Sequence, residues 1–519
     1  MAGSTLLSLD CGTQSVRALL FDLEGNLLAR SQAVFEPAYQ SPEPGWAEQP
    51  ADYYWDSLVK ACQCLWDMPG VDKAAIAGVS VTTQRATVVP VDAAGKALHP
   101  AILWLDQREA NDLPPLSLHW QALFRAVGET DTINYLRRQV EANWLSAHKP
   151  EVWRNTHKFL LLSGYLGFRM TGRFADSVGS QVGYIPFDYK RQQWCRPWDW
   201  KWEAMPIARR QLPELVPASS RLGQVTAEAA AATGIPVGLP VIAAGADKAC
   251  EVLGSGCISP EQGALSFGTT ATINTVQSRY IEATPMLPPY PAAVPGRFCT
   301  EVQTLRGFWM VNWFKEEFGH REQVKALECG QPVEALFDEL LLSTPPGAMG
   351  LMLQPYWSPG IREPGREAKG ALIGFGDVHT RAHIYRAIIE GLAYALREGR
   401  EKIEKRSGRR LRVLRVSGGG SQSDAVVQIM ANVFGLPAER PHTYETSGLG
   451  AAICTAVGLG LQPSHDVAVS RMVRVGKRFL PEPAAQHTYN ALYRRVYQPL
   501  YAQLQPLYQE IRAITGYPR

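Results

Sequence analysis

The sequence contains no apolar run that approaches the ~18 residues of a membrane-spanning helix, and its first residues lack the basic segment and apolar core of a secretion signal. We therefore expect a cytoplasmic protein with no membrane partner. The net charge is only +3 over 519 residues, which gives no reason to expect nucleic acid as a partner. The basic run from Arg397 to Arg415 also contains Glu398, Glu401 and Glu404, so it predicts a solvated helix and loop.

Paired C-x-x-C motifs are also missing. The nine cysteines are odd in number and scattered along the chain, at Cys11, Cys62, Cys64, Cys195, Cys250, Cys257, Cys299, Cys329 and Cys454. This spacing favours reduced, mostly buried thiols over a disulfide framework or a structural zinc site.

The composition is that of a globular protein, with 46% hydrophobic and 19% charged residues. Because 519 residues exceed what one hydrophobic core usually covers, we expect two domains. Strand-like and helix-like segments alternate in the first half: residues 77–83 and 87–90 are predicted strands, and residues 50–66 and 157–171 are predicted helices. This alternation predicts the α/β fold class.

The segment 5–25 is the most informative part of the chain, because two apolar strand-like runs meet there at a polar turn. The turn carries Asp10, Gly12, Thr13 and Ser15. Gly12 lets the backbone approach an anion, the following N–H groups and hydroxyls can donate to phosphate oxygens, and Asp10 can hold the Mg²⁺ that accompanies a nucleotide. A buried hairpin with a Gly-Thr turn and no ligand has the same pattern, and this alternative stays open.

A second hairpin of the same kind is predicted near the middle of the chain. Residues 264–267 lead into Gly268, Thr269 and Thr270, and residues 271–276 return. Two Gly-Thr hairpins about half a chain apart predict two similar domains, each of which offers a phosphate loop to a shared cleft.

Asp247 follows an apolar strand that begins at Val241. Phosphoryl transfer to a hydroxyl needs a group that orients the nucleophile and takes its proton, so Asp247 is the candidate base. Asp247 is equally suited to cap the helix that follows it, and the two roles are compatible.

A third glycine turn lies in residues 413–420, where a β-branched strand runs into three glycines ahead of a predicted amphipathic helix at 421–435. Such a turn lets the backbone lie flat against a nucleoside while the helix N-terminus favours its phosphates.

Polar residues end two apolar strands of the first half. Residues 82–85 include Gln84 and Arg85, and residues 104–108 include Trp104 and Asp106. These side chains offer hydrogen-bond donors and acceptors to vicinal hydroxyls and an indole to cover an apolar face, which indicates a polyhydroxylated substrate. The alternative is a structural Arg–Asp pair that braces the two strand ends.

In order along the chain, these motifs resemble the FGGY family of carbohydrate kinases, within the actin, hexokinase and heat-shock chaperone superfamily. The resemblance covers nearly the whole chain. Residues 10–15 resemble the first phosphate motif of the family, residues 266–270 its second, and residues 417–420 its adenosine motif, while Asp247 falls at the position of the catalytic base. Residues 350–364 and 369–390 resemble two further family signatures.

The resemblance implies two actin-like (ribonuclease H-like) domains with an interdomain cleft. Residues 2–246 would bind the sugar and contribute the first phosphate loop, and residues 247–519 would bind the nucleotide. A homodimer is a common assembly in the family, although the sequence shows no interface signature.

The resemblance also implies ATP and Mg²⁺ as cofactors and a small sugar as partner. Its implied nucleotide-binding residues are Asp10, Gly12, Thr13, Gln14, Ser15, Arg17, Gly268, Thr269, Thr270, Gly307, Asn312, Gly418, Gly419 and Ser423. Its implied substrate-binding residues are Gln84, Arg85, Trp104, Asp106, Asp247 and Lys248, and Mg²⁺ would lie near Asp10 and Asp247.

The prediction is an ATP-dependent carbohydrate kinase that phosphorylates a hydroxyl of a small ketose, such as a pentulose, or of a related polyol, with Asp247 as general base. Ala86 stands where glycerol kinases of the family carry Glu, Glu141 stands where members usually carry Lys, and xylulose kinases usually show Met-His-Gly around the position of Gln84. The alternatives are a glycerol or other polyol kinase, a non-kinase actin-like ATPase switch, and a regulator that binds a sugar without phosphorylating it.

Overall fold

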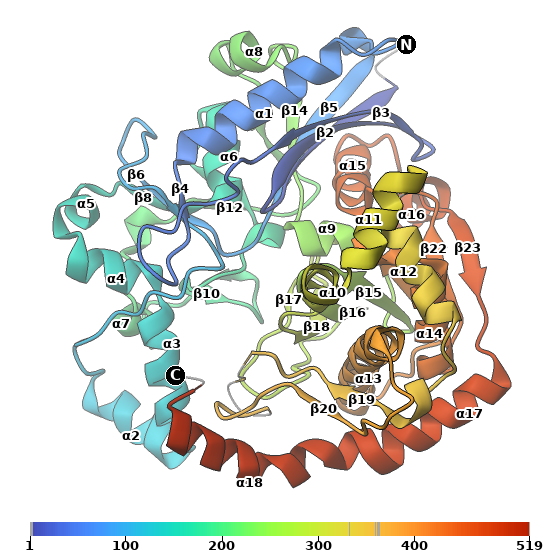
Figure 1. Cartoon of the computed structure of the whole chain (residues 1–519). Coiled ribbons are helices and arrows are strands. Elements are labelled where there is room, and N and C mark those ends of the chain that lie inside the picture. The colour runs from blue at the N-terminus through green and yellow to red at the C-terminus, as the bar shows by residue number, and fades with distance from the viewer. Residues whose placement is uncertain (1–3, 332, 359, 361–363, 518–519) are drawn as a thin grey trace.

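Two large mixed sheets organise the chain (Figure 1), whose computed structural model describes residues 4–331, 333–358, 360 and 364–517. The first sheet has the strand order β13 (Arg221–Gln224), β14 (Pro240–Ala243), β5 (Ile76–Thr83), β1 (Thr5–Cys11), β2 (Ser15–Asp22) and β3 (Leu27–Val34). The second has the order β17 (Tyr290–Pro291), β18 (Phe298–Thr304), β16 (Ala271–Gln277), β15 (Gln262–Phe267), β21 (Val413–Ser417), β22 (Ala438–Pro441) and β23 (Val475–Phe479).

The two sheets repeat one arrangement. In the first, β1 pairs antiparallel with β2 and parallel with β5. In the second, β15 pairs antiparallel with β16 and parallel with β21. Both predicted Gly-Thr hairpins are therefore confirmed as β1–β2 and β15–β16, and the α/β fold with two domains is confirmed as well.

Helices cover both faces of the first sheet. Helix α1 (Ala51–Trp66), predicted from its apolar spacing, packs on β2 and β3 through a core that includes Tyr54 and Leu58. The other face is covered by α15 (Thr446–Gly458), which comes from the C-terminal half and crosses α9 (Asp247–Gly254). One cluster joins Leu6, Leu253 and Leu449, so the two halves share buried apolar surface. The division between residues 246 and 247 remains a prediction, and its outer limits at Ala2 and Arg519 lie outside the described residues.

Around the second sheet, the largest core is built on the long helix α13 (Arg381–Ser407). The other helices of this half are α10 (Trp309–Phe318), α11 (His320–Cys329), α12 (Val333–Leu342), α14 (Asp424–Phe434), α16 (His465–Met472), α17 (Pro483–Leu492) and α18 (Gln498–Thr515), with the short pair β19 (Met352–Gln354) and β20 (Ala371–Ile373). Figure 1 shows α17 and α18 running along the bottom of the molecule toward α2 and α3. The predicted signature loop at 350–364 lies partly outside the described residues.

A smaller region of the first half carries short helices around a four-stranded sheet and has its own core. The sheet has the order β4 (Glu48–Gln49), β7 (Ala101–Ile102), β6 (Val88–Val91) and β8 (Lys158–Leu161). The helices of this region are α2 (Leu118–Ala126), α3 (Thr130–Gln139), α4 (Glu141–His148), α5 (Pro150–Asn155) and α7 (Lys201–Ala204). Helices α6 (Leu162–Thr171) and α8 (Ala227–Thr233) of the same half contribute instead to the core of the first sheet. The remaining strands are β9 (Ala175–Ser177), β10 (Phe187–Asp188), β11 (Gln193–Trp194) and β12 (Glu214–Val216).

Two sequence predictions are wrong in part. The helix predicted for 157–171 begins only at Leu162, because Lys158–Leu161 pairs antiparallel with β6 as β8. The basic run after Arg397 is not wholly solvated. Arg397 is only 6% exposed, because its guanidinium donates to the Val433 carbonyl at 2.8 Å and lies 4.2 Å from the Tyr493 ring centre.

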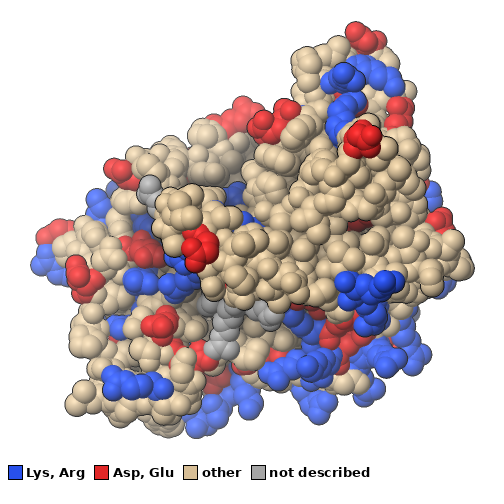
Figure 2. Space-filling view, turned by 60° about the horizontal axis from the view of Figure 1, so that its bottom comes forward, with Lys and Arg blue, Asp and Glu red and all other residues tan. Residues whose placement is uncertain are grey.

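The surface charge is mixed and most of the cysteines are buried free thiols, as the sequence predicts. Figure 2 shows Lys and Arg side chains intermixed with Asp and Glu on one face, with basic groups gathered along its lower edge. All nine cysteines lie within the described ranges and are free thiols, and seven of them are buried. Among the described helices, none is long and apolar enough to cross a bilayer.

Candidate active site

The first hairpin places a buried carboxyl group at its tip. Asp10 is 5% exposed and lies near the end of β1, where its Oδ2 is 3.5 Å from Nη1 of Arg17 on β2. The pKa of Asp10 is raised to about 7, mainly by burial. The charge of Arg17 opposes this rise, and the charge of Asp247 contributes to it. The turn closes tightly, because the Gly12 N–H donates to the Ser15 carbonyl at 3.0 Å.

A second, half-buried carboxyl group begins α9. The strand before Asp247 ends at Ala243, and Ala246 occupies the N-cap position, so Asp247 is the first helical residue. Its Oδ1 accepts the Lys248 N–H at 2.6 Å. Burial raises the pKa of Asp247, while Arg85 and Lys248 oppose that rise. Because Asp247 raises the pKa of Asp10, the two carboxyl groups are near enough to interact electrostatically.

Backbone at two of the glycine turns is open to an approaching group. A Cβ at Gly419 would meet no described atom within 4 Å, and one at Gly268 would meet only the Thr270 carbonyl oxygen, at 3.5 Å. Thr269 is exposed at the tip of the second hairpin. Gly418 has φ of +83° and lies against the Phe267 backbone, so the turn after β21 requires glycine there.

Four other predicted nucleotide residues have structural partners or lie at the surface. A Cβ at Gly307 would overlap Ala271, so this glycine permits close packing of the segment before α10. The Ser423 hydroxyl caps α14, accepting the Val426 N–H at 3.1 Å. Gln14 and Asn312 are exposed.

Lys248 is held toward the second sheet. Its ammonium group pairs with Glu251 and donates to the Ser266 hydroxyl on β15 at 2.6 Å. The Ser417 hydroxyl at the end of β21 donates to Glu251 at 2.7 Å. This buried network ties α9, and with it Asp247, to the second phosphate hairpin and to the strand before the third glycine turn.

A chain of hydrogen bonds joins the first hairpin to two predicted substrate residues. Trp104 Nε1 donates to the Thr13 hydroxyl at 3.0 Å, and that hydroxyl donates to Gln84 Oε1 at 3.0 Å. Gln84 Nε2 donates in turn to the Tyr54 hydroxyl at 3.3 Å. The structure thus brings together the turn after β1, the residue that follows β5 and the 104–108 loop.

Arg85 connects the two halves of the chain. Its guanidinium makes a two-pronged ion pair with Glu301 on β18, at 3.1 and 3.2 Å, and lies 5.1 Å from the Tyr290 ring centre. Burial opposes the charge on Arg85, but Glu301, Tyr290 and Asp247 raise its pKa. The sequence did not indicate Glu301, because the partner is 216 residues away.

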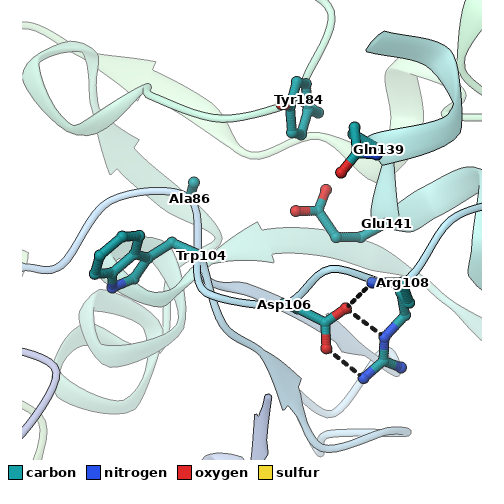
Figure 3. A pocket seen from close by; sticks show the side chains of 7 residues that line it. All are labelled: Ala86, Trp104, Asp106, Arg108, Gln139, Glu141 and Tyr184. Carbon is teal, nitrogen blue, oxygen red and sulfur yellow. Dashed lines mark hydrogen bonds and ion pairs between the residues drawn. The ribbon is translucent and has the colours of Figure 1, made fainter. Parts of the chain in front are cut away.

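A pocket of about 110 Å³ opens next to these residues (Figure 3). Its lining residues are Ala86, Trp104, Asp106, Arg108, Gln139, Glu141 and Tyr184. Ala86 has φ of +54°, a strained conformation for a residue with a side chain, of the kind that occurs at functional sites. The sequence indicated Glu141 only as a departure from the family pattern, and it did not predict that Gln139 and Tyr184 line a pocket.

Two models of one protein family match the two halves of the chain. The model of the N-terminal domain of the FGGY family of carbohydrate kinases matches residues 5–254, and the model of its C-terminal domain matches residues 263–459. The chain is 30% identical to a protein described as the uncharacterized sugar kinase YgcE of Escherichia coli K12, over 96% of this chain and 94% of that protein.

Two xylulose kinases show the same correspondence. The chain is 28% identical to the xylulose kinase of Lactococcus lactis, over 94% of this chain and 95% of that enzyme. The crystal structure of the xylulose kinase from Rhodospirillum rubrum superposes with a TM-score of 0.79, at 27% identity, over 97% of this chain and 100% of that chain.

Proposed function

Because the chain belongs to the FGGY family of carbohydrate kinases, and is therefore a phosphotransferase with an alcohol group as acceptor, we propose that it moves the γ-phosphoryl group of ATP to a hydroxyl of a small ketose or related polyol. The observation that carries the proposal is the pair of interacting carboxyl groups, the buried Asp10 beside the first Gly-Thr hairpin and the half-buried Asp247 on the helix that is tied to the second through Lys248 and Ser266. Asp247 acts as the general base. A cytoplasmic location and a homodimer remain predictions.

The residues present fit a magnesium nucleotide. Two neighbouring carboxylates that repel each other favour a cation between them, and Mg²⁺ in kinases is commonly held by one or two carboxylates together with substrate phosphates. In the part of the chain that the structure describes, no group of three or more His, Cys, Asp or Glu forms a complete metal cage, which agrees with this open type of site. Asp10 and Asp247 would hold the ion, and it would neutralise charge on the transferred group.

The proposed phosphate contacts come from both hairpins. Thr13, Ser15 and the backbone around Gly12 face the phosphates from one half, and Gly268 and Thr269 face them from the other. The uncrowded backbone at Gly419 supports an adenosine position beside the third turn.

Asp247 accepts the proton of the substrate hydroxyl as its oxygen forms the new bond to the γ-phosphorus. The bond between that phosphorus and the β,γ-bridging oxygen breaks, and ADP leaves with the electron pair. A raised pKa makes the Asp247 carboxylate a better proton acceptor than an ordinary aspartate. The positive charges of Arg85 and Lys248 oppose this rise in its pKa.

The pocket beside Gln84 and Trp104 supports a kinase over an ATPase switch or a sugar-binding regulator, because a switch has no need for a polar acceptor site next to its phosphate loop. The test is ADP release, coupled to a fluorescence readout, over a panel of tetruloses, pentuloses, hexuloses and four- to six-carbon polyols. One or more acceptors should stimulate ADP release with an equal yield of phosphosugar. ATP hydrolysis that no acceptor changes would contradict the proposal.

A further inference from the structure

Glu141 is the one pocket carboxyl group with a free acceptor oxygen among the described lining residues. It is the first residue of α4 and is 8% exposed, and its Oε2 is buried without a hydrogen-bond partner. Figure 3 shows the carboxyl group pointing into the pocket, between Tyr184 and Gln139 on one side and the Asp106–Arg108 pair on the other. Leaving a buried polar group unpaired is costly, so a group of this kind marks a place for a ligand donor.

Asp106, the predicted substrate residue, has no acceptor capacity left. Its Oδ1 accepts the Arg108 N–H and Nε at 2.9 and 2.7 Å, and its Oδ2 accepts the Ala47 N–H and Arg108 Nη2, both at 2.7 Å. Two carboxylate oxygens offer about four lone-pair positions, and these four donors fill them. Asp106 therefore holds the 104–108 loop in shape. This is the structural Arg–Asp pair that the sequence analysis left open, and Arg108 is the arginine of the pair.

The guanidinium of Arg108 is held mainly by other protein groups. Its side chain is 2% exposed, it hydrogen-bonds to Asp106, and it lies 4.1 and 4.5 Å from the ring centres of Trp46 and Trp144. Its Nη1 is 2.8 Å from Glu48 Oε1 as an ion pair but has no hydrogen-bond partner among the described residues. Three carboxyl groups, from Glu48, Asp106 and Glu141, thus surround one cation. Glu48 and Asp106 already outnumber Arg108, so an anionic ligand would meet net repulsion there, and Glu141 adds to that repulsion when it is ionised. Hydroxyl groups, in contrast, can pair with Glu141 in either form.

From this geometry we propose that Glu141 binds a hydroxyl of the acceptor away from the reacting one, and that it makes the enzyme select neutral polyhydroxylated acceptors over sugar acids and phosphosugars. This inference rests on the proposed kinase function. A pocket of about 110 Å³ has room for several water-sized groups, so it takes the far end of a short carbon chain.

The charge state of Glu141 agrees with a neutral ligand. The pKa of Glu141 is raised to about 8, mainly by burial. The charge of Asp106 contributes to the rise, and the charge of Arg108 opposes it. Tyr184, which also lines the pocket, has its own pKa raised by burial and by Glu141. A hydroxyl can donate to a carboxylate or accept from a carboxyl group, so a polyol pairs with either form of Glu141.

The test uses D-xylulose and xylitol as neutral acceptors, D-gluconate as the anionic one, and the variants Glu141→Ala, Glu141→Gln and Glu141→Lys. Glu141→Ala should raise KM for the neutral acceptor about 10- to 100-fold, the effect of losing one hydrogen bond to a charged group, and leave KM for ATP within about twofold. Glu141→Gln keeps an acceptor oxygen, so its KM for the neutral acceptor should rise less than that of Glu141→Ala. Glu141→Lys should raise the ratio of kcat/KM for gluconate to that for the neutral acceptor. The control is Glu151→Gln, an exposed glutamate on the next helix, α5.

Thermal unfolding separates this role from a structural one. Because Oε2 has no protein partner, Glu141→Gln should not lower the unfolding temperature of the ligand-free protein, and Glu141→Ala should lose the rise in that temperature that D-xylulose or xylitol gives the wild type. A Glu141→Gln variant with a lower unfolding temperature and an unchanged acceptor KM would overturn the inference. So would a wild type that neither acceptor stabilises. Stabilisation without turnover would contradict the kinase function and leave the binding role of Glu141 supported.

Discussion

At the residue scale, the proposed chemistry depends on two aspartates with different charged neighbours. Asp10 lies between Arg17 and the negative field of Asp247, while Asp247 lies between Arg85 and Lys248. Both pKa values are raised, but Asp247 has two cations to oppose the rise. The cations beside Asp247 favour its ionised form, which is the form that a general base needs.

Replacing Asp247 by Asn should therefore abolish proton acceptance with little change in shape. We expect kcat to fall ~10²-fold or more, and KM for ATP to stay within a few fold, because general-base catalysis typically contributes that much. The matched control is Asp466→Asn, a largely exposed aspartate. Steady-state kinetics at saturating acceptor measure both parameters, and a kcat near that of the wild type would remove Asp247 from the mechanism.

Asp10→Asn should stabilise the metal-free protein while it impairs catalysis. The pKa of Asp10 is about 7 in the folded state and 3.8 in an unfolded chain, so folding favours the protonated form and the wild type loses stability as pH rises from about 4 to 7. The variant lacks this loss. Its advantage in the free energy of unfolding should therefore grow across that pH range, with an upper limit on the order of 4 kcal/mol at pH 8. The difference in unfolding temperature should grow with it. Thermal melts in EDTA at several pH values measure it, and a pH-independent difference would contradict the raised pKa.

The sequence predicts site residues where a strand end or a glycine turn exposes polar groups, and their roles stay predictions. The structure shows that three of these residues are neighbours, because the Thr13 hydroxyl is hydrogen-bonded to both Gln84 and Trp104. It could not identify Glu301, because a partner from the other half of the chain leaves no local pattern. Nor could it show that the donors around Asp106 fill its acceptor positions, since this depends on loop geometry.

At the scale of elements, the crossing of α9 and α15 positions the proposed base. A Cβ at Gly450 would overlap the Cys250 carbonyl oxygen, and a Cβ at Gly254 would overlap the Thr446 carbonyl oxygen, so the two backbones touch at both ends of the contact. Since Asp247 begins α9, any separation of these helices moves the carboxylate relative to Asp10.

Gly450→Ala should force the two helices apart. We expect a loss of stability of about 1–3 kcal/mol, the usual cost of overpacking, together with a lower kcat, because reacting groups tolerate little displacement. Gly376→Ala is the control, because its Cβ would meet its neighbours at ordinary distances, 3.7 Å or more. Denaturant unfolding and kinetics on the same samples provide the comparison. A variant as stable and as active as the control would show that the crossing has room for a methyl group.

Elements were predictable where periodicity or a hairpin turn marks them, as for β1, β2, β15, β16 and α1. The failures have physical causes. Lys158–Leu161 is apolar enough to continue the helix that follows it, and only its pairing with the distant β6 makes it a strand. Arg397 resembles its solvated neighbours in sequence, but the Val433 carbonyl and the Tyr493 ring bury it.

At the scale of the whole molecule, the two halves are not separable units joined by a linker. Helix α15 belongs to the second half in sequence but covers a face of the first sheet through Leu449 and its neighbours. Arg85 and Glu301 pair between the halves as well. Any movement that closes the molecule around its substrates must therefore pivot near α9 and α15, because those helices are packed against both sides.

The fragment 1–246 should consequently fail to fold stably by itself. Removing α9 and α15 exposes the apolar face that includes Leu6, Leu19 and Phe21, all of which are fully buried in the whole chain. An uncovered patch of this kind promotes aggregation. We expect the fragment to be insoluble or to unfold without cooperativity, and co-expression with residues 247–519 to restore a soluble complex with kinase activity, as size-exclusion chromatography and ADP release would show. A monomeric fragment that unfolds cooperatively near the temperature of the full chain would mean that the first sheet is stable without α15, and the pivot would then have to lie elsewhere.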